Sequence, residues 1–189
     1  MYKEPQSLRW RFWARPYALL DPIRRLFEPP QKLIEPYAKN GLVVADLGCG
    51  SGYYTFPLAE LVGPEGKVYA VDLDKKCIRA IQKKAEKVAY HNIEAYDSSA
   101  SDVSFIKDRS VDFVFAIGLL CSMADSRQSA VNEIKRMLKS TGQAYISLGF
   151  PPPLGFVDQA EWEKMLAGFR VERGGSFKEL FAVVSLKEG

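Results

Sequence analysis

The stretch VVADLGCGSG, residues 43–52, joins a short apolar run to a turn that is rich in glycine. This order is typical of a strand that ends in a tight turn and leads into a helix. Because glycine has no Cβ, the backbone at Gly48, Gly50 and Gly52 can turn sharply and approach a bound molecule closely. The N–H groups at the start of the next helix would face that molecule. The stretch therefore predicts a ligand site at the end of a strand.

The glycine spacing argues against a dinucleotide. A dinucleotide site has the pattern GxGxxG, and its third glycine lets the helix pack closely on the strand so that its N-terminus holds a pyrophosphate. Here Tyr53 stands at that third position. A bulky side chain there favours a smaller and less anionic ligand.

An acidic residue after the next strand indicates a nucleoside. The run Val68-Tyr69-Ala70-Val71-Asp72 ends in a carboxylate 20 residues after Gly52. At this position a carboxylate accepts hydrogen bonds from both ribose hydroxyls. The alternative is a helix cap, but Asp74 suits that role better because it directly precedes an amphipathic helix at residues 75–89.

The rest of the chain alternates strands and helices. Strands are expected at residues 42–47, 67–73, 93–96, 111–120, 143–150, 169–174 and 180–186. Helices are expected at residues 31–39, 53–62, 75–89, 129–138 (ended by Thr141-Gly142) and 157–167. The alternation predicts an α/β fold, a three-layer sandwich around a seven-stranded, mostly parallel, Rossmann-like sheet. The last two strands have no helix between them and should form an antiparallel C-terminal hairpin.

Two regions are expected. Residues 1–30 are expected to form an N-terminal arm with several arginine and aromatic side chains, and residues 31–189 the domain that contains the ligand site. The arm either closes over the site, contacts an anionic or aromatic substrate, or packs on the fold or in a dimer.

The chain resembles the class I S-adenosylmethionine-dependent methyltransferases. The run from Asp46 to Gly52, DLGCGSG, matches their first motif, and Val71-Asp72 matches the acid that ends their second strand. Residues 53–74 resemble the small branch that includes ubiquinone and arsenite methyltransferases. The likeness covers about 150 of the 189 residues and leaves out roughly the first 30.

The resemblance implies S-adenosylmethionine as cofactor and a role for each matching position. Gly48, Cys49 and Gly50 would pass under the methionine and ribose portions. Asp46 would orient the loop and the methionine amino group. Asp72 would hold the ribose diol.

The remaining implied contacts surround the adenine and the methionine. Leu73 would pack on the adenine, and Gly118 and Leu119 would line the methionine side. The family often has an acidic residue followed by Ala after the third strand, whereas this chain has Ser99 and Ala100 there. These two residues are the candidates for the adenine edge.

No catalytic residue and no metal ligands can be named. The methyl group of the cofactor is already activated, so proximity and orientation can supply much of the catalysis. His91 precedes a strand and is expected at the amino edge of the sheet, as is Asp112. Cys49 and Cys121 are expected to be packing residues, and Asp125 a helix cap.

Composition limits the remaining choices. The chain has a net charge of +3, and its longest nearly unbroken apolar run, residues 113–124, is too short to span a bilayer. No signal peptide is expected, and three scattered cysteines favour a reducing cytoplasm. The small charge favours a small-molecule acceptor over nucleic acid or protein. An NAD-dependent oxidoreductase and a non-catalytic nucleoside-binding protein are the alternatives. The acceptor and the oligomeric state are left open.

Overall fold

The computed structural model describes residues 29–123, 125–148, 157–175 and 180–187. Within them a seven-stranded sheet has the order β3-β2-β1-β4-β5-β7-β6. Its strands are β1 (Val43–Leu47), β2 (Lys67–Asp72), β3 (Ile93–Asp97), β4 (Val111–Ile117), β5 (Leu138–Ser147), β6 (Phe169–Gly175) and β7 (Phe181–Leu186). The first five pair in parallel, and β7 runs antiparallel to both β5 and β6. The predicted mostly parallel sheet with an antiparallel terminal hairpin is confirmed.

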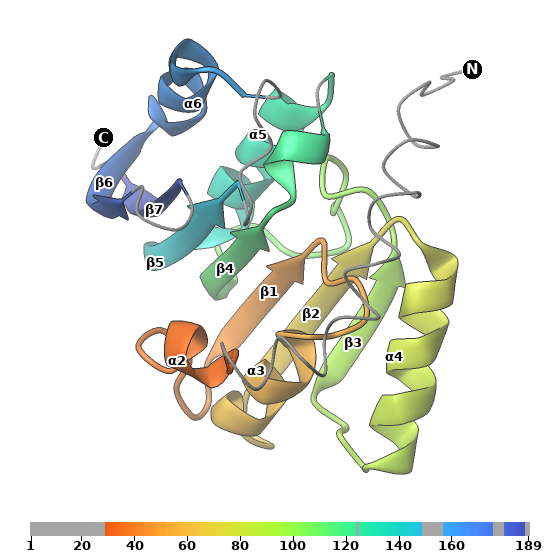
Figure 1. The fold of residues 1–189 in the computed structure, drawn as a ribbon. Coiled ribbons are helices and arrows are strands. Elements are labelled where there is room, and N and C mark those ends of the chain that lie inside the picture. Colours follow the sequence, from red (N-terminus) through yellow and green to blue (C-terminus); the bar gives the residue numbers. More distant parts are fainter. Residues whose placement is uncertain (1–28, 124, 149–156, 176–179, 188–189) are drawn as a thin grey trace.

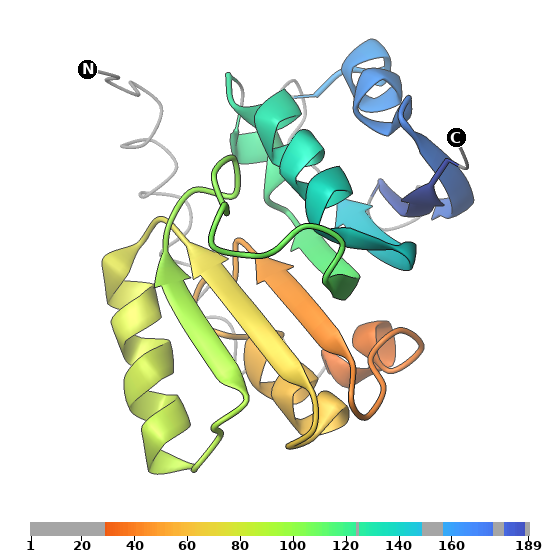
Figure 2. The same ribbon diagram turned by 180° about the vertical axis from the view of Figure 1, so that it is seen from behind.

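Helices cover both faces of this sheet (Figures 1 and 2). They are α2 (Gln31–Ile34), α3 (Thr55–Val62), α4 (Lys75–Lys87), α5 (Arg127–Met137) and α6 (Gln159–Leu166), with a 3-10 turn η1 at Leu120–Ser122. The side chains of α2 and α3 pack with Val44 and Val68, and those of α4 pack with Ala70 on the same face. The side chains of α5 and α6 pack with Ala45 and Val71 on the other face. The three predicted layers are therefore present.

Strand alternation explains this arrangement. Successive residues of a strand point to opposite faces, so an apolar strand such as β4 supplies both cores. Val114 and Ala116 lie in the core under α5, whereas Phe113 and Phe115 lie in the core under α3. The parallel strands all end at one edge of the sheet, where β1, β2 and β4 lead into loops (Figure 1).

Several predicted boundaries were wrong by a few residues, and two errors have clear causes. The fourth strand ends at Ile117, not at residue 120, because Gly118 has a positive φ of 66° and turns the chain into η1. Helix α5 ends at Met137, and β5 already begins at Leu138, where the backbone is extended. Thr141-Gly142 therefore lies within a strand and does not end the helix. Nearly all of the predicted arm lies outside the described residues.

Candidate functional site

The glycine turn after β1 has the backbone conformation that its sequence predicts. Gly48, Gly50 and Gly52 have φ values of 75°, 51° and 84°, a region that side chains with a Cβ rarely adopt. The backbone N–H groups of Gly48 and Cys49 both donate to the carbonyl oxygen of Val71, at 2.8 and 3.1 Å. The turn is thus held against the end of β2.

Asp72 ends β2 beside this turn. Its Oδ2 accepts a hydrogen bond from the backbone N–H of Gly50 at 2.9 Å, and its Oδ1 accepts one from the backbone N–H of Asp74 at 2.8 Å. These two bonds fix the orientation of the carboxylate. Because a carboxylate has about four acceptor positions, both oxygens retain capacity for the hydroxyl groups of a ligand.

Asp46 lies beneath the turn. It is only 3% exposed, and its Oδ2 accepts a hydrogen bond from the hydroxyl of Thr55 at 2.7 Å. Burial raises the pKa of Asp46 to about 7, against the lowering effect of the Thr55 bond and with a smaller raising effect from the negative charge of Asp72. Asp46 therefore joins the end of β1 to the first residue of α3.

The segment after β4 packs against the glycine turn. A Cβ built on Gly48 would lie 3.0 Å from Cδ1 of Leu119. Gly118 bends the chain there, and its N–H donates to the carbonyl oxygen of Ser147 at 3.0 Å. The structure thus brings Gly118 and Leu119 to the same edge as the glycine turn.

The segment after β3 also reaches this edge. The N–H of Ser98 donates to the carbonyl oxygen of Asp72 at 3.2 Å. The hydroxyl of Ser99 is 2.7 Å from that of Ser101, and Ala100 is buried in the core under α5. Leu73, in contrast, is 63% exposed. An exposed apolar side chain beside Asp72 is available to a flat apolar ligand group.

The turn leaves room for a ligand on one side. Among the residues that the structure describes, no atom lies within 4 Å of a Cβ built on Gly50, although Gly50 contacts Asp72 through its N–H. Tyr53 is buried and lies edge-on to Tyr54, with ring centroids 4.9 Å apart. Tyr53 therefore fills the position where a dinucleotide site needs a small residue. These features fit a nucleoside joined to a small amino acid.

The methyltransferase domain family matches residues 44–142, more than half of the chain. A crystal structure of an S-adenosylmethionine-dependent methyltransferase from Aquifex aeolicus is 28% identical, with a TM-score of 0.75 over 92% of this chain and 97% of that one. This chain belongs to the class I S-adenosylmethionine-dependent methyltransferases. Their cofactor, S-adenosylmethionine, is the compound that the residues around Gly50 and Asp72 fit. A TehB-like methyltransferase from Corynebacterium glutamicum, 20% identical over 94% of this chain and 97% of its own with a TM-score of 0.73, shares the fold.

Two curated relatives of this methyltransferase are named demethylmenaquinone methyltransferase. The one from Lactococcus lactis is 34% identical over 121 residues, which is 64% of this chain and 47% of that protein. The one from Geobacillus stearothermophilus is 31% identical over 104 residues, 55% of this chain and 44% of that protein. The chain thus spans about half the length of these relatives. Neither relative supports the alternative of an NAD-dependent oxidoreductase.

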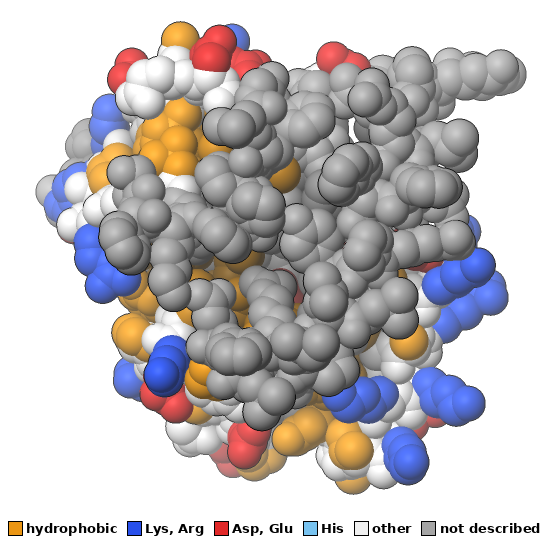
Figure 3. Space-filling view, in the orientation of Figure 1, with side chains coloured by type: hydrophobic (Ala, Val, Ile, Leu, Met, Phe, Trp, Pro, Cys, Tyr) orange, Lys and Arg blue, Asp and Glu red, His pale blue; other side chains and the backbone are white. Residues whose placement is uncertain are grey.

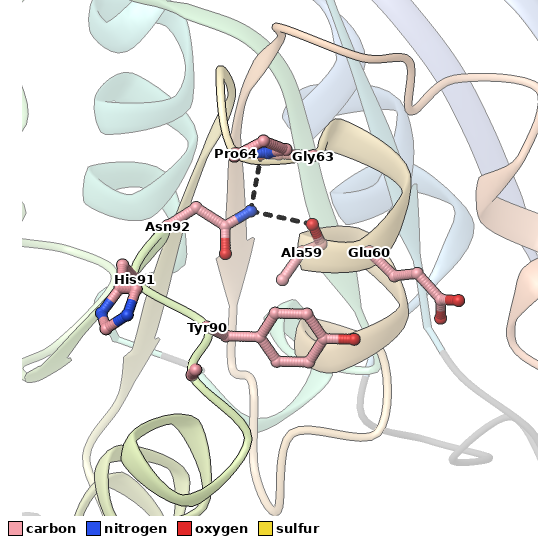
Figure 4. A pocket seen from close by; sticks show the side chains of 8 residues that line it. Ala59, Glu60, Gly63, Pro64, Tyr90, His91 and Asn92 are labelled. Carbon is pink, nitrogen blue, oxygen red and sulfur yellow. Dashed lines mark hydrogen bonds between the residues drawn. The ribbon is translucent and has the colours of Figure 1, made fainter.

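The methyltransferase places its single histidine away from the glycine turn. His91 lies two residues before β3, at the amino end of that strand, as predicted, and Figure 4 shows it beside Asn92. It lines a cavity of about 360 Å³ together with Tyr90 and Asn92. The Nδ2 of Asn92 donates to the carbonyl oxygens of Ala59 and Gly63, both at 2.8 Å, and so joins this turn to the end of α3. These contacts are structural.

Asp112, Cys121 and Cys49 are the other residues whose side chains can act as a base or a nucleophile, and their surroundings argue against such roles. Asp112 accepts from the N–H of Val43 and from Lys139, at the amino edge. Burial raises the pKa of the Cys121 thiol to about 11, and that thiol donates to the carbonyl oxygen of Gly118 at 3.2 Å. Burial likewise raises the pKa of Cys49. Both thiols are therefore protonated at neutral pH.

Near η1 one prediction was wrong, and the role of one residue was not predicted. The cap prediction for Asp125 was wrong, because α5 begins at Arg127 and its N-cap is Ser126. Arg127 is buried, and it donates through Nε to the carbonyl oxygen of Leu120 and through Nη1 to Glu161, both at 2.8 Å. It thus connects the segment that packs on the glycine turn with α6. A basic residue at a helix start gives no sequence signal of this role.

Proposed function

We propose that this protein transfers the methyl group of S-adenosylmethionine to a small-molecule acceptor with a quinone-type ring in its reduced form. The proposed binding of the cofactor depends most on one observation: the N–H groups of Gly50 and Asp74 hold the carboxylate of Asp72. The acceptor is supported by the match to demethylmenaquinone methyltransferases at 31% and 34% identity.

The residue roles follow from the positions described above. Asp72 binds the ribose hydroxyls, and Leu73 covers one face of the adenine, with Ser99 and Ala100 at its edge. Asp46 orients the turn and attracts the methionine amino group. Gly48, Cys49 and Gly50 would lie under the methionine and ribose, and Gly118 and Leu119, of which Leu119 packs on Gly48, would line the methionine side.

When bound, the cofactor would supply an activated methyl group: the acceptor ring carbon would bond to it as its bond to sulfur breaks, which leaves S-adenosylhomocysteine, and the proton displaced from that ring carbon would pass to water. The described residues contribute orientation and exclusion of water rather than a general base. Electron density at a ring carbon of a hydroquinone comes from its own hydroxyl groups, so such an acceptor suits a site of this kind.

The extent of the domain and the compartment are part of the proposal. We propose residues 31–189 as the methyltransferase domain and residues 1–30 as a separate N-terminal arm. All three cysteines are free, which favours a reducing compartment such as the cytoplasm. Neither a nucleic acid nor a protein acceptor is favoured by a net charge of +3.

Isothermal titration calorimetry with S-adenosylhomocysteine tests the cofactor site. Asp72→Ala should weaken binding by roughly 1–3 kcal/mol, because a charged hydrogen-bond acceptor is lost. Asp74→Ala is the matched control: its side chain only caps α4 by accepting from the N–H of Lys76 at 2.9 Å, so it should reduce stability by about 1 kcal/mol and leave binding unchanged. Equal binding by the Asp72→Ala variant and the unmodified protein would contradict the assignment.

Transfer of radiolabelled methyl groups tests the reaction. The unmodified protein should label a reduced demethylated naphthoquinone and not the oxidised form. Label that appears only in RNA or protein fractions of a cell extract would show that the acceptor class is wrong.

A further inference from the structure

Helix α4 concentrates the positive charge of the chain. Between Lys75 and Lys87 it has six basic residues and one acid, Glu86, which gives a net charge of +5. The whole chain has a net charge of +3, so the remainder sums to −2. The positive charge on α4 is therefore larger than the net charge of the whole chain.

Four of these basic residues form a stripe along the solvent-exposed face of α4. The buried face of the helix has Ile78, Ile81 and Ala85. With 3.6 residues per turn, the opposite face carries the four side chains that we call the basic stripe: Lys76, Arg79, Lys83 and Lys87. All four are exposed, and none forms an ion pair with any residue that the structure describes.

The two lysines beside the stripe are different. Lys75 is 3.4 Å from the carboxylate of Asp97, and Nζ of Lys84 lies 3.8 Å from the ring centre of Phe56. The side chains of the basic stripe are therefore the ones on α4 that are available to contact a partner. Because the ends of the stripe, Lys76 and Lys87, are 11 positions apart on the helix, it is about 16 Å long.

The stripe begins next to the cofactor site. Helix α4 starts three residues after Asp72, with the exposed Leu73 between them, and the exposed Val88 follows the other end of the helix. Exposed Lys and Arg side chains lie on the side of the molecule where α4 lies, and others lie on the opposite side (Figure 3). A surface that contacts α4 would therefore also lie close to the open edge of the site.

We propose that the basic stripe docks this protein on an anionic lipid surface. This inference rests on the proposed quinone-type acceptor, since quinones with an isoprenoid tail dissolve in the bilayer and must be met at its surface. A lysine-rich helical face with apolar residues at its ends has the chemistry of an interfacial contact. RNA-binding surfaces combine basic with exposed aromatic side chains, and the sequence of α4, KKCIRAIQKKAEK, has no aromatic residue.

Sedimentation with lipid vesicles tests the proposal on the full chain. The protein should bind vesicles that contain phosphatidylglycerol and not vesicles of phosphatidylcholine alone. Raising NaCl from about 0.05 M to about 0.5 M should release it, since the contact is between exposed charges. At about 1 kcal/mol for each of the four basic residues, removal of the stripe should weaken binding by roughly a thousandfold.

A matched pair of variants separates the stripe from net charge. The stripe variant combines Lys76→Gln, Arg79→Gln, Lys83→Gln and Lys87→Gln. The control variant makes the same charge change at exposed lysines on other elements: Lys32→Gln, Lys39→Gln, Lys107→Gln and Lys164→Gln. Only the stripe variant should lose vesicle binding, and both should bind S-adenosylhomocysteine normally.

The outcomes distinguish this proposal from the proposed function. Equal vesicle binding by the stripe variant and the unmodified protein, or binding of RNA in place of vesicles, would overturn the docking proposal. Methyl transfer to a short-chain, water-soluble quinol should be the same in both variants, whereas transfer to a long-chain quinol in anionic vesicles should fall only in the stripe variant. If neither quinol accepts the methyl group, the proposed acceptor is wrong, and the vesicle measurement still decides the docking.

Discussion

The hydroxyl of Thr55 donates a hydrogen bond of 2.7 Å to the carboxyl group of Asp46, and both residues are buried. Asp46 is the last residue but one of β1, and Thr55 is the first residue of α3. The glycine turn lies between them in sequence. One buried bond thus fixes the distance between the strand and the helix that the turn joins.

The raised pKa of Asp46 predicts a pH-dependent stability. The pKa rises from 3.8 to about 7 on folding, so the folded state binds the proton more tightly than the unfolded state. The stability from this group is fully present below about pH 4 and is lost as the pH rises through about 7. In Asp46→Asn, the decrease in the free energy of unfolding between about pH 5 and about pH 8 should be smaller by about 2 kcal/mol.

Urea unfolding at the two pH values measures this difference. Asparagine has the same shape and an oxygen that accepts from Thr55, so the fold should persist. Parallel pH dependences for the variant and the unmodified protein would mean that Asp46 has an ordinary pKa.

The glycine turn predicts different effects at two positions. Gly50→Ala should cost roughly 1–2 kcal/mol of stability because of its positive φ, and its methyl group would enter the open space beside Asp72. It should therefore weaken S-adenosylhomocysteine binding by more than it lowers stability. Gly48→Ala adds a contact of 3.0 Å with Leu119 and should lose more stability than Gly50→Ala.

Gly41→Ala is the control for backbone strain. Gly41 has a φ of 81° and lies before β1, and within the described part of the chain no atom lies within 4 Å of a Cβ built on it. It should lower the unfolding temperature about as much as Gly50→Ala while leaving binding unchanged. If the two variants bind S-adenosylhomocysteine equally well, Gly50 does not border the ligand.

The parts that the sequence predicted correctly depend on local patterns. The turn at Gly48, the strand ending in Asp72 and the cap at Asp74 each follow from a few consecutive residues and their spacing. The alternation of strands and helices also predicted that the sheet is mostly parallel, since parallel strands require crossover connections. Burial on both faces made β4 recognisable from its apolar run.

The parts that the sequence did not predict depend on tertiary contacts. No pattern indicates that Thr55 bonds to Asp46, because the bond forms only after β1 and α3 pack together. The early start of β5 at Leu138 reflects pairing with Val111, and Thr141-Gly142 lies where the register shifts before Phe113 pairs with Gln143. Arg127 reads as a surface residue in the sequence but is enclosed between η1 and α6.

The raised thiol pKa values predict slow alkylation. Burial raises the pKa of Cys121 and that of Cys77 to about 11, so little thiolate exists at neutral pH. Their reaction with iodoacetamide at about pH 8 should be about a hundredfold slower in the folded protein than in urea. Mass spectrometry of the alkylated peptides measures each rate. Fast labelling of Cys121 in the folded state would contradict its raised pKa and would make this thiol a candidate nucleophile.

Arg127 is predicted to support the cofactor site through Leu120 and Leu119. Arg127→Lys keeps the charge but cannot donate to the Leu120 carbonyl and to Glu161 in the same fork geometry. It should lower stability by roughly 1–3 kcal/mol, because buried partners are left unsatisfied. Since Leu119 packs on Gly48, the dissociation constant for S-adenosylhomocysteine should also rise.

Glu161→Gln separates this support from general stability. That variant leaves the bond between Arg127 and the Leu120 carbonyl in place and changes a residue whose side chain is 47% exposed. It should cost less than about 1 kcal/mol and leave binding unchanged, because Glu161 lies on α6, which packs on α5 and β6. If Arg127→Lys loses stability but binds S-adenosylhomocysteine as tightly as the unmodified protein, Arg127 only connects η1 and α6. A selective loss of affinity in Arg127→Lys would show that the segment after β4 needs this side chain to hold Leu119 against the turn.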